Sequence, residues 1–298
     1  MEETQDRGRT SLPLRDSTGG APAGGFKSRG AIVFRFRVAA AVLVAIAAFG
    51  FLLLRMPAPY SSECDLSYWP SSKLVSGEWT WARTPSGIDY NLYIPSGVDI
   101  EDPGAELPLI VVLHGSTGKA ISKDRYGRLF TRADAQAAFG PKGAAVIAPQ
   151  SRIEYYTDPD SYARFIYNIL IAYPCISRNR IALWGHSQGA AFSLELGAAH
   201  PGLFRAIAPG SSYYSASPAE LFRLARLKVW YATARNDSGI WEQGHRTGRI
   251  LAAICPDSRY LEYPTRGHFY IENADAYPPG DPGAEETFIS WLVRALED

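Results

Sequence analysis

The 298-residue sequence lacks an excess of either charge, since 30 lysines and arginines balance 30 aspartates and glutamates. Nucleic-acid-binding domains usually carry a basic face or stripe, so this balance gives no indication of a nucleic-acid partner. Histidine and cysteine are also scarce, with five and three residues. Each histidine can therefore be weighed individually as a catalytic base. None of the cysteines lies in a recognisable catalytic motif, which argues against a thiol nucleophile.

Three cysteines allow at most one disulfide and leave one thiol over. Cys64 lies just after an apolar segment near the N-terminus, whereas Cys175 and Cys255 each come shortly before a predicted strand. A structural bridge between Cys175 and Cys255 is one open pairing. The sequence does not choose among the three possible pairings.

Long uncharged apolar runs are rare as well, and the one that stands out is "VAAAVLVAIAAFGFLLL" at 38–54. A membrane-spanning helix needs about 17–25 such residues. We expect a transmembrane signal-anchor over 31–55, preceded by a disordered tail over 1–30 that is rich in glycine, serine and proline. A linker over 56–75 follows it. Because lysines and arginines gather before the run, the positive-inside rule predicts a cytoplasmic N-terminus and an extracytoplasmic remainder.

Two alternatives to the anchor stay open, a cleaved signal peptide that releases a secreted domain and a buried core helix. The segment "RMPAPYSSEC" offers only a poor small-x-small cleavage site, and Glu63 stands where a lipoprotein signal needs a small residue. A reporter that works only outside the cytoplasm, fused after Asp298, is expected to be active. An inactive fusion would contradict the anchor model.

From 76 to 298 the pattern alternates between strand-like and helix-like segments. Two opening strands, "GEWTWAR" and "DYNLYIP", precede the buried runs "LPLIVVLHG", "GAAVIAPQ", "RIALWG", "FRAIAPG", "LKVWYATA" and "RYLEYPT", with helical segments between most of them. Such alternation predicts an α/β catalytic domain with a mostly parallel central sheet and helices on both faces. The segment between "APG" and "LKVWY" is too short for a large cap domain, although a small helix over 218–226 fits there.

The motif "GHSQG" lies between the strand "RIALW" and the helical segment "AAFSLELGAA". A strand that turns sharply into a helix can expose one side chain at the carboxyl edge of a sheet, and Ser187 occupies that position. The tight turn needs small residues two positions away on either side, which accounts for Gly185 and Gly189. Because the strand and helix are both present, we interpret Ser187 as a nucleophile rather than as an ordinary turn serine.

A serine nucleophile needs a histidine base and a carboxylate that orients it. His268 in "TRGHFY" follows the last predicted strand and fits the order serine, acid, histidine. Asp237 follows the apolar strand "KVWYATA" and is the predicted acid, with Glu242 as its nearest rival. The remaining histidines fit less well as the base. His114 precedes the serine, and His186 lies inside the "GHSQG" turn itself. His200 ends a helix, and His245 is expected to be exposed at a helix start.

The oxyanion of an acyl-transfer intermediate needs hydrogen-bond donors. The backbone N–H of Gln188 is one expected donor, because it directly follows the nucleophile. The second is expected from the "HGSTG" loop, with Ser116 favoured and Gly115 or Thr117 as alternatives. Aromatic residues in nearby loops are predicted to form a substrate rim, although core packing explains them equally well. The rim residues are Tyr213, Trp241, Phe269 and Tyr270.

These pieces together resemble the α/β-hydrolase fold, and within it the polyhydroxybutyrate-depolymerase-like esterases that include feruloyl and acetylxylan esterases. The resemblance covers about 89–270 and includes "YNLYIP", "LIVVLHGSTG", "VIAPQ", "CISRNRIALWGHSQGAAFSLELGAAHPGLFRAIAPGSS", "YATARND" and "GHFY". It assigns nucleophile, acid and base to Ser187, Asp237 and His268. The chain departs from the family pattern at Ala190 and at Ser177. It departs again after His268, where Phe-Tyr replaces the usual Trp-Pro.

The resemblance implies a serine carboxylic ester hydrolase that needs no cofactor and no metal. Its substrate would be a small-molecule or polysaccharide-linked ester. The same three residues could instead serve an acyltransferase or a serine peptidase. A non-catalytic binding module of the same fold is the alternative from another class.

Overall fold

The computed structural model describes residues 74–84, 86–116, 126–151, 156–268 and 286–297. All of them belong to one compact unit, Ser62–Asp298. The predicted tail, the predicted membrane span and most of the predicted linker lie outside the described residues, so these assignments stay predictions. Among the helices within the described ranges, none is long and apolar enough to cross a membrane.

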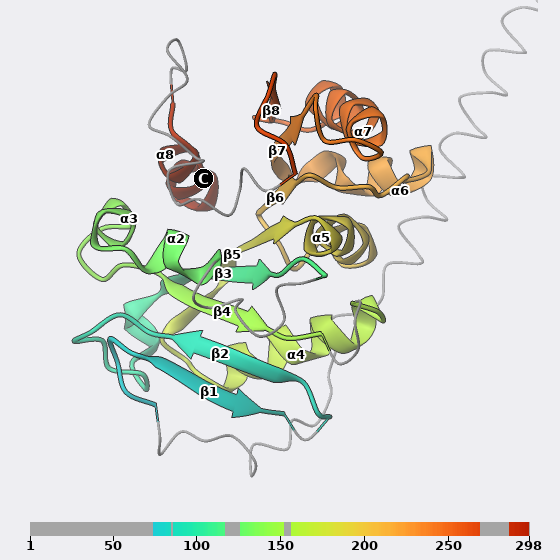
Figure 1. Cartoon of the computed structure of the whole chain (residues 1–298). Helices are drawn as coiled ribbons and strands as arrows, with labels where there is room; N and C mark the ends of the chain where they lie inside the picture. Colours follow the sequence, from blue (N-terminus) through green and yellow to red (C-terminus); the bar gives the residue numbers. More distant parts are fainter. Residues whose placement is uncertain (1–73, 85, 117–125, 152–155, 269–285, 298) are drawn as a thin grey trace, which may run out of the picture. The chain divides into compact units, whose positions relative to one another are not determined.

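A single eight-stranded sheet forms the centre of this unit, with the strand order β1-β2-β4-β3-β5-β6-β7-β8 (Figure 1). The strands are β1 (Trp79–Arg83), β2 (Asp89–Tyr93), β3 (Leu107–Leu113), β4 (Ala145–Pro149), β5 (Ile176–His186), β6 (Ala206–Gly210), β7 (Lys228–Ala234) and β8 (Arg259–Tyr263). β2 pairs antiparallel with β1 and with β4, and every other pairing is parallel. The predicted mostly parallel sheet is therefore confirmed, and its parallel strands end at a common edge.

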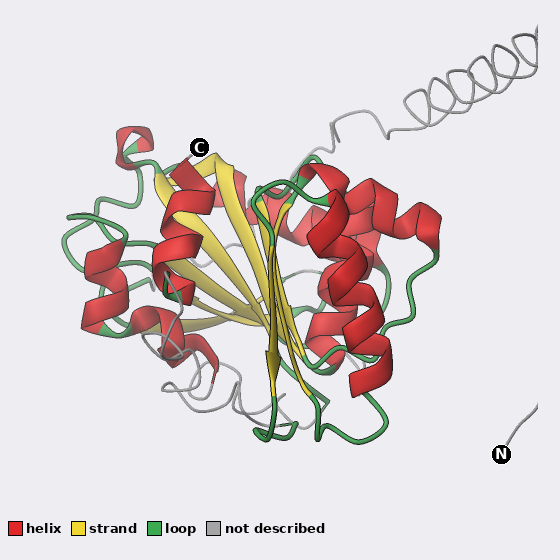
Figure 2. Cartoon of the chain, turned by 90° about the horizontal axis from the view of Figure 1, so that it is seen from above, coloured by secondary structure: helices red, strands yellow, loops and turns green. Residues whose placement is uncertain are grey.

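Helices cover both faces of the sheet (Figure 2). They are α2 (Arg128–Thr131), α3 (Ala133–Ala138), α4 (Pro159–Ala172), α5 (Gln188–Ala199), α6 (Pro218–Arg223), α7 (Trp241–Ile254) and α8 (Phe288–Glu297), with short 3-10 turns η3 (Pro103–Ala105) and η5 (Leu224–Arg226). The predicted small helix over 218–226 is confirmed as α6 and η5.

The alternation of side chains along each strand divides the core into two layers. All seven residues of β3 are buried, as expected for a strand covered on both faces. Leu109 and Val111 pack in the layer that contains α4, α5 and α7, whereas Ile110 and Val112 pack in the layer that contains α2 and α8. Successive residues of a strand point to opposite faces, so one continuous apolar run supplies both layers.

The helical segment before β4 differs from its prediction. The sequence pattern predicts one helix over about 125–139, but the structure breaks it at Arg132, which is extended with φ −62° and ψ 146°. The Arg132 guanidinium binds the carboxylate of Asp134 in the first turn of α3, with an N–O distance of 2.9 Å. The amide of Gln136 bonds the carbonyls of Phe130 and Ala144, which ties α3 to the start of β4. Hydrogen bonds of these side chains have no signal in helical periodicity.

The Cys175–Cys255 bridge that the sequence left open is wrong. Both residues are free, buried thiols. Cys175 precedes β5 and Cys255 follows α7, which packs on β7, and β6 separates β5 from β7. Two strand spacings exceed the reach of a disulfide. Burial raises the pKa of Cys175 to about 11 and that of Cys255 to about 12, so both remain protonated. Cys64 lies outside the described residues.

Candidate active site

Ser187 occupies a strained turn between β5 and α5. Its backbone has φ 53° and ψ −115°, a conformation that non-glycine residues adopt only when the surrounding structure imposes it. The Ser187 N–H donates to the carbonyl of Gly210 at the end of β6, at 2.9 Å. The Ser187 carbonyl accepts from Ala191 as α5 begins. The turn is thus held from both neighbouring elements, and strain of this kind is a feature of functional sites.

The two glycines of the motif have the steric reason that the sequence predicts. A Cβ on Gly185 would lie 2.3 Å from the carbonyl oxygen of Gly189. A Cβ on Gly189 would lie 2.2 Å from the carbonyl oxygen of Leu113, at the end of β3. Both neighbours are backbone atoms that cannot move aside, so only glycine allows β5, the turn and β3 to approach so closely.

Ser187, His268 and Asp237 form one line of hydrogen bonds. His268 Nε2 lies 3.0 Å from Ser187 Oγ, and His268 Nδ1 lies 2.9 Å from Asp237 Oδ2. Asp237 is 3% exposed, whereas the His268 side chain is 23% exposed. The structure therefore brings together the three residues that the sequence selects, although 81 positions separate the serine from the histidine.

Neighbouring hydrogen bonds hold the segments that carry Asp237 and His268 in register. Asp237 follows β7, and its carbonyl accepts from the N–H groups of Ile240 and Trp241 where α7 begins. The side-chain oxygen of Asn236 accepts from the N–H of Gly267 at 2.7 Å. Asn236 thereby ties the loop that carries His268 to the loop that carries Asp237.

Gly115, two residues after β3, lies directly against the serine. A Cβ on Gly115 would be 3.4 Å from Ser187 Cβ, whereas Ser116 is exposed and is the last described residue before 126. Gln188 is the first residue of α5, and the first backbone N–H groups of a helix have no partner within the helix. The predicted oxyanion donors thus flank Ser187, and their role stays a prediction. Thr117 lies outside the described residues.

His114 fixes the orientation of the peptide bond between Gly115 and Ser116. Its Nε2 accepts from the N–H of Ser151 at 3.1 Å, so the proton sits on Nδ1, which donates to the carbonyl of Gly115 at 2.7 Å. In a trans peptide the carbonyl of Gly115 and the N–H of Ser116 point in opposite directions. His114 therefore sets the direction of the Ser116 N–H. Tyr156 adds a further bond by accepting from the His114 N–H at 3.1 Å.

His186 and Ser211 contact the base in a way that sequence reasoning missed. His186 Nε2 lies 2.8 Å from the carbonyl oxygen of His268, and Ser211 Oγ donates to the same oxygen at 3.5 Å. The only sequence signal for these contacts is position, since His186 ends β5 and Ser211 directly follows β6. Strand ends meet at one edge of the sheet, but the partner on a distant loop cannot be identified from that fact.

The remaining histidines have other partners. His200 ends α5, as predicted, and its Nε2 lies 2.9 Å from Asp160. His245 was expected at an exposed helix start, which is wrong, because α7 begins earlier at Trp241. His245 Nδ1 lies 2.6 Å from Glu262 and 2.9 Å from the Tyr260 hydroxyl. Burial alone would raise the pKa of Glu262, but hydrogen bonds from Tyr260, Arg235 and His245 outweigh it and lower this pKa to about 2.

The rival acid and the predicted rim are only partly tested by the structure. Glu242 lies in the first turn of α7, where a carboxylate suits the helix dipole. Tyr213 is 41% exposed in the segment after β6. The Trp241 ring packs against His245 with ring centroids 5.2 Å apart. Phe269 and Tyr270 lie outside the described residues, so the rim stays a prediction.

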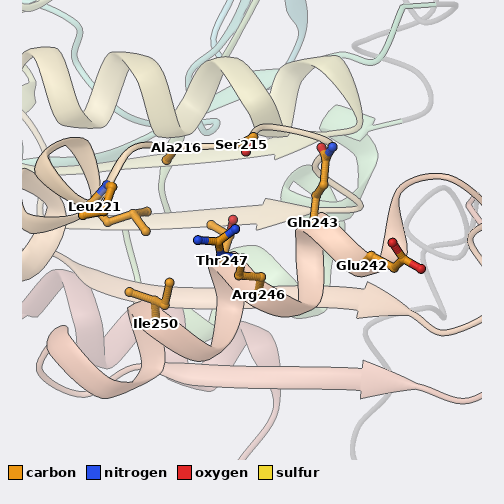
Figure 3. A pocket seen from close by; sticks show the side chains of 9 residues that line it. Ser215, Ala216, Leu221, Glu242, Gln243, Arg246, Thr247 and Ile250 are labelled. Atoms are coloured by element: carbon orange, nitrogen blue, oxygen red, sulfur yellow. The ribbon is translucent and has the colours of Figure 1, made fainter.

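A cavity of about 260 Å³ lies between the segment after β6 and the N-terminal half of α7 (Figure 3). Its lining is mixed, with Ser215 and Leu221 on one side and Glu242, Gln243, Arg246 and Thr247 on the other. The Thr247 hydroxyl donates to the carbonyl of Tyr214, which joins the two walls. The cavity is thus formed by the segments that follow β6 and β7. The end of β6 accepts from the Ser187 N–H through Gly210, and Asp237 follows β7.

No protein-family model and no curated protein matches the sequence. Solved structures of esterases are similar in fold. A thermostable esterase has a TM-score of 0.52 at 22% identity, and the match covers 63% of this chain and 54% of that one, so this chain spans about half of its length. A ferulic acid esterase has a TM-score of 0.53 at 13% identity, covering 74% and 97% of the two chains. The feruloyl esterase module from Clostridium thermocellum, complexed with sinapinate, has a TM-score of 0.51 at 14% identity, covering 74% and 92%.

Proteins with so little sequence identity share the fold, and function has to be argued from the site. The comparison, together with the strand order and the helices on both faces, confirms the predicted α/β-hydrolase fold.

Proposed function

We propose that this chain, an α/β-hydrolase-fold protein, is a serine hydrolase that cleaves carboxylic esters through an acyl-enzyme on Ser187. One observation carries the proposal, the unbroken line of hydrogen bonds from buried Asp237 through His268 to Ser187 Oγ. The strained backbone of Ser187 supports it further, because such strain is costly and clusters at active sites.

The first half of the reaction transfers the acyl group to the enzyme. Ser187 Oγ attacks the ester carbonyl carbon while His268 Nε2 takes the hydroxyl proton. Asp237 accepts the Nδ1–H of His268, which keeps Nε2 available as the base and stabilises the imidazolium that forms. When the bond between the carbonyl carbon and the leaving oxygen breaks, the imidazolium gives its proton to the departing alcohol.

The second half regenerates the enzyme. Water attacks the acyl carbon while His268 Nε2 takes one of its protons, and the acid leaves as that proton returns to Ser187 Oγ. In both halves the carbonyl oxygen becomes an oxyanion. Preorganised N–H donors at Gln188 and in the Gly115–Ser116 segment would stabilise this charge, and removing one such donor from a serine hydrolase typically costs about 10²–10³ in kcat.

The substrate class that we propose is a small-molecule ester or an ester linked to a polysaccharide. Two of the structurally similar proteins are a ferulic acid esterase and a feruloyl esterase module, which supports testing feruloyl esters.

The proposal is tested by covalent labelling together with a substrate panel. A fluorophosphonate probe is expected to form one adduct, on Ser187, which peptide mass spectrometry identifies. The panel contains short-chain nitrophenyl esters, feruloyl esters, acetylated sugars and aminoacyl amides. Hydrolysis of esters in preference to amides is the expected result.

Other outcomes would replace the proposal. Amide cleavage without ester cleavage would indicate a peptidase, and transfer of the acyl group to an added alcohol in preference to water would indicate an acyltransferase. Absence of any adduct on folded protein would favour a non-catalytic module.

A further inference from the structure

His186 is buried at the end of β5, directly before the nucleophile. It is 1% exposed and lies on the same side of the strand as Trp184, because side chains two residues apart share a face. Tyr126 lies beside both, with ring centroids 5.5 Å from Trp184 and 5.8 Å from His186. A buried polar side chain in this aromatic layer needs hydrogen-bond partners, and the partners identify its role.

The hydrogen bonds of His186 assign its tautomer. The carbonyl oxygen of His268 can only accept, so the His186 Nε2 that lies 2.8 Å away carries a proton and donates it. The other ring nitrogen, Nδ1, lies 3.5 Å from the Tyr126 hydroxyl, which can donate. His186 is thus placed to donate from Nε2 to the carbonyl of His268 and to accept at Nδ1 from the Tyr126 hydroxyl.

The same ring touches the other two parts of the site. Its centroid lies 4.9 Å from the centroid of the His268 ring. A Cβ added to Gly115 would lie 3.3 Å from His186 Nδ1. His186 therefore contacts the loop after β3 and the base, and it is joined covalently to Ser187.

We infer that His186 is a positioning residue: its Nε2–H bond to the His268 carbonyl holds the imidazole of His268 at hydrogen-bonding distance from Ser187 Oγ. Asp237 fixes the rotation of the His268 ring by accepting from its Nδ1–H. On the N-terminal side of His268, Asn236 holds the main chain by accepting from the N–H of Gly267. On the C-terminal side, His186 Nε2 lies closer to the His268 carbonyl oxygen than Ser211 Oγ does, at 2.8 Å against 3.5 Å.

This inference rests on the proposed function, and it predicts a loss in the chemical step. A displacement of about 1 Å in a catalytic group can cost about 100-fold in rate. Losing the His186 donor is therefore expected to lower kcat by about 10- to 100-fold, with KM changed by no more than about twofold. KM is expected to change little because His186 is only 1% exposed and therefore offers almost no surface to a bound substrate.

The experiment compares His186→Gln with His186→Met in the full chain. The two replacements have similar length, but only glutamine can donate to the His268 carbonyl, and methionine adapts well to irregular spaces. We expect His186→Gln to keep most of kcat and His186→Met to lose it, at matched thermal stability. His200→Met, which removes a histidine at the C-terminal end of the neighbouring helix α5, is the control and is expected to keep full activity.

A spectroscopic measurement separates positioning from general destabilisation. The His268 Nδ1–H that bonds Asp237 should give a strongly deshielded proton NMR signal in the wild type and in His186→Gln, and this signal should shift or disappear in His186→Met. If His186→Met does not fold, His186→Phe takes its place as the variant without a donor.

The outcomes distinguish this inference from the proposed function. Equal kcat values and equal NMR signals for His186→Gln and His186→Met would overturn the positioning role while Ser187-dependent hydrolysis persists. A wild-type protein without esterase activity would overturn the proposed function, and the NMR comparison would still decide whether His186 positions the imidazole.

Discussion

Replacing Ser187 with alanine is expected to lower kcat for ester hydrolysis by about 10⁶-fold, the size of the loss when a serine nucleophile is removed from a hydrolase. The alanine leaves His268 and Asp237 in place, but no oxygen then lies 3.0 Å from His268 Nε2 to attack the carbonyl. Some acceleration over the uncatalysed reaction should remain, because the oxyanion donors and the binding surface are unchanged. Steady-state kinetics and loss of the fluorophosphonate adduct both measure this effect.

The matched control for Ser187→Ala is Ser193→Ala in the same helix. Ser193 is fully buried in α5, and its hydroxyl donates only to the carbonyl of Ala190 one turn earlier. Its removal is expected to leave kcat within about threefold of the wild type, because the hydroxyl makes no contact with the site and a local helix bond is worth only about 1 kcal/mol. A Ser187→Ala protein as active as Ser193→Ala would contradict the assignment of the nucleophile.

Gly189→Ala is expected to destabilise the folded state by about 3 kcal/mol or to prevent folding, because forced overpacking against atoms that cannot move costs that much or more. The new Cβ would lie 2.2 Å from the carbonyl oxygen of Leu113 and 2.6 Å from that of His114. Relief requires α5 and the end of β3 to separate, which would also move the segment at Gly115 away from Ser187. Urea denaturation measures the loss of stability, and kcat of any folded fraction measures the loss of alignment.

Gly197→Ala makes the same substitution in the same helix and is the control. Its nearest neighbour would be a side-chain methyl of Leu224 at 3.1 Å, which can adjust. Alanine in a helix interior is favoured over glycine by about 1 kcal/mol, so this variant is expected to be neutral or slightly stabilised. Equal stability of the two variants would show that the close approach of α5 to β3 does not depend on Gly189.

The sequence was informative where a structural requirement is local. The strand-turn-helix context of Ser187 and its two glycines is contained in a dozen consecutive residues. The crowding at Gly185 comes from Gly189 in the same segment, whereas the crowding at Gly189 comes from Leu113 of β3 and is visible only in the structure. The mostly parallel sheet could be predicted in the same way, since strands that alternate with helices form βαβ units. Asp237 and His268 were reached through chain order, and the hydrogen bonds between them agree with that choice.

The sequence was less informative where the outcome depends on side-chain contacts that neither periodicity nor a motif encodes. One predicted helix became α2 and α3 because Gln136 bonds carbonyls outside its own helix. His245 was predicted to be exposed but meets Glu262 on β8, 17 positions away. A bridge between two cysteines was conceivable until the sheet placed β6 between the strands nearest to them.

What the sequence by itself determined is therefore the turn at Ser187, the alternation of strands and helices, and the choice of three residues that the structure joins by hydrogen bonds, Ser187, Asp237 and His268. What only the tertiary structure decided is how the base is held. His186 and the carbonyl of His268 are 82 positions apart, and no periodicity or motif connects them. They meet because parallel strands bring the end of β5 and the loop after β8 to one edge of the sheet, and a buried imidazole there has to find an acceptor.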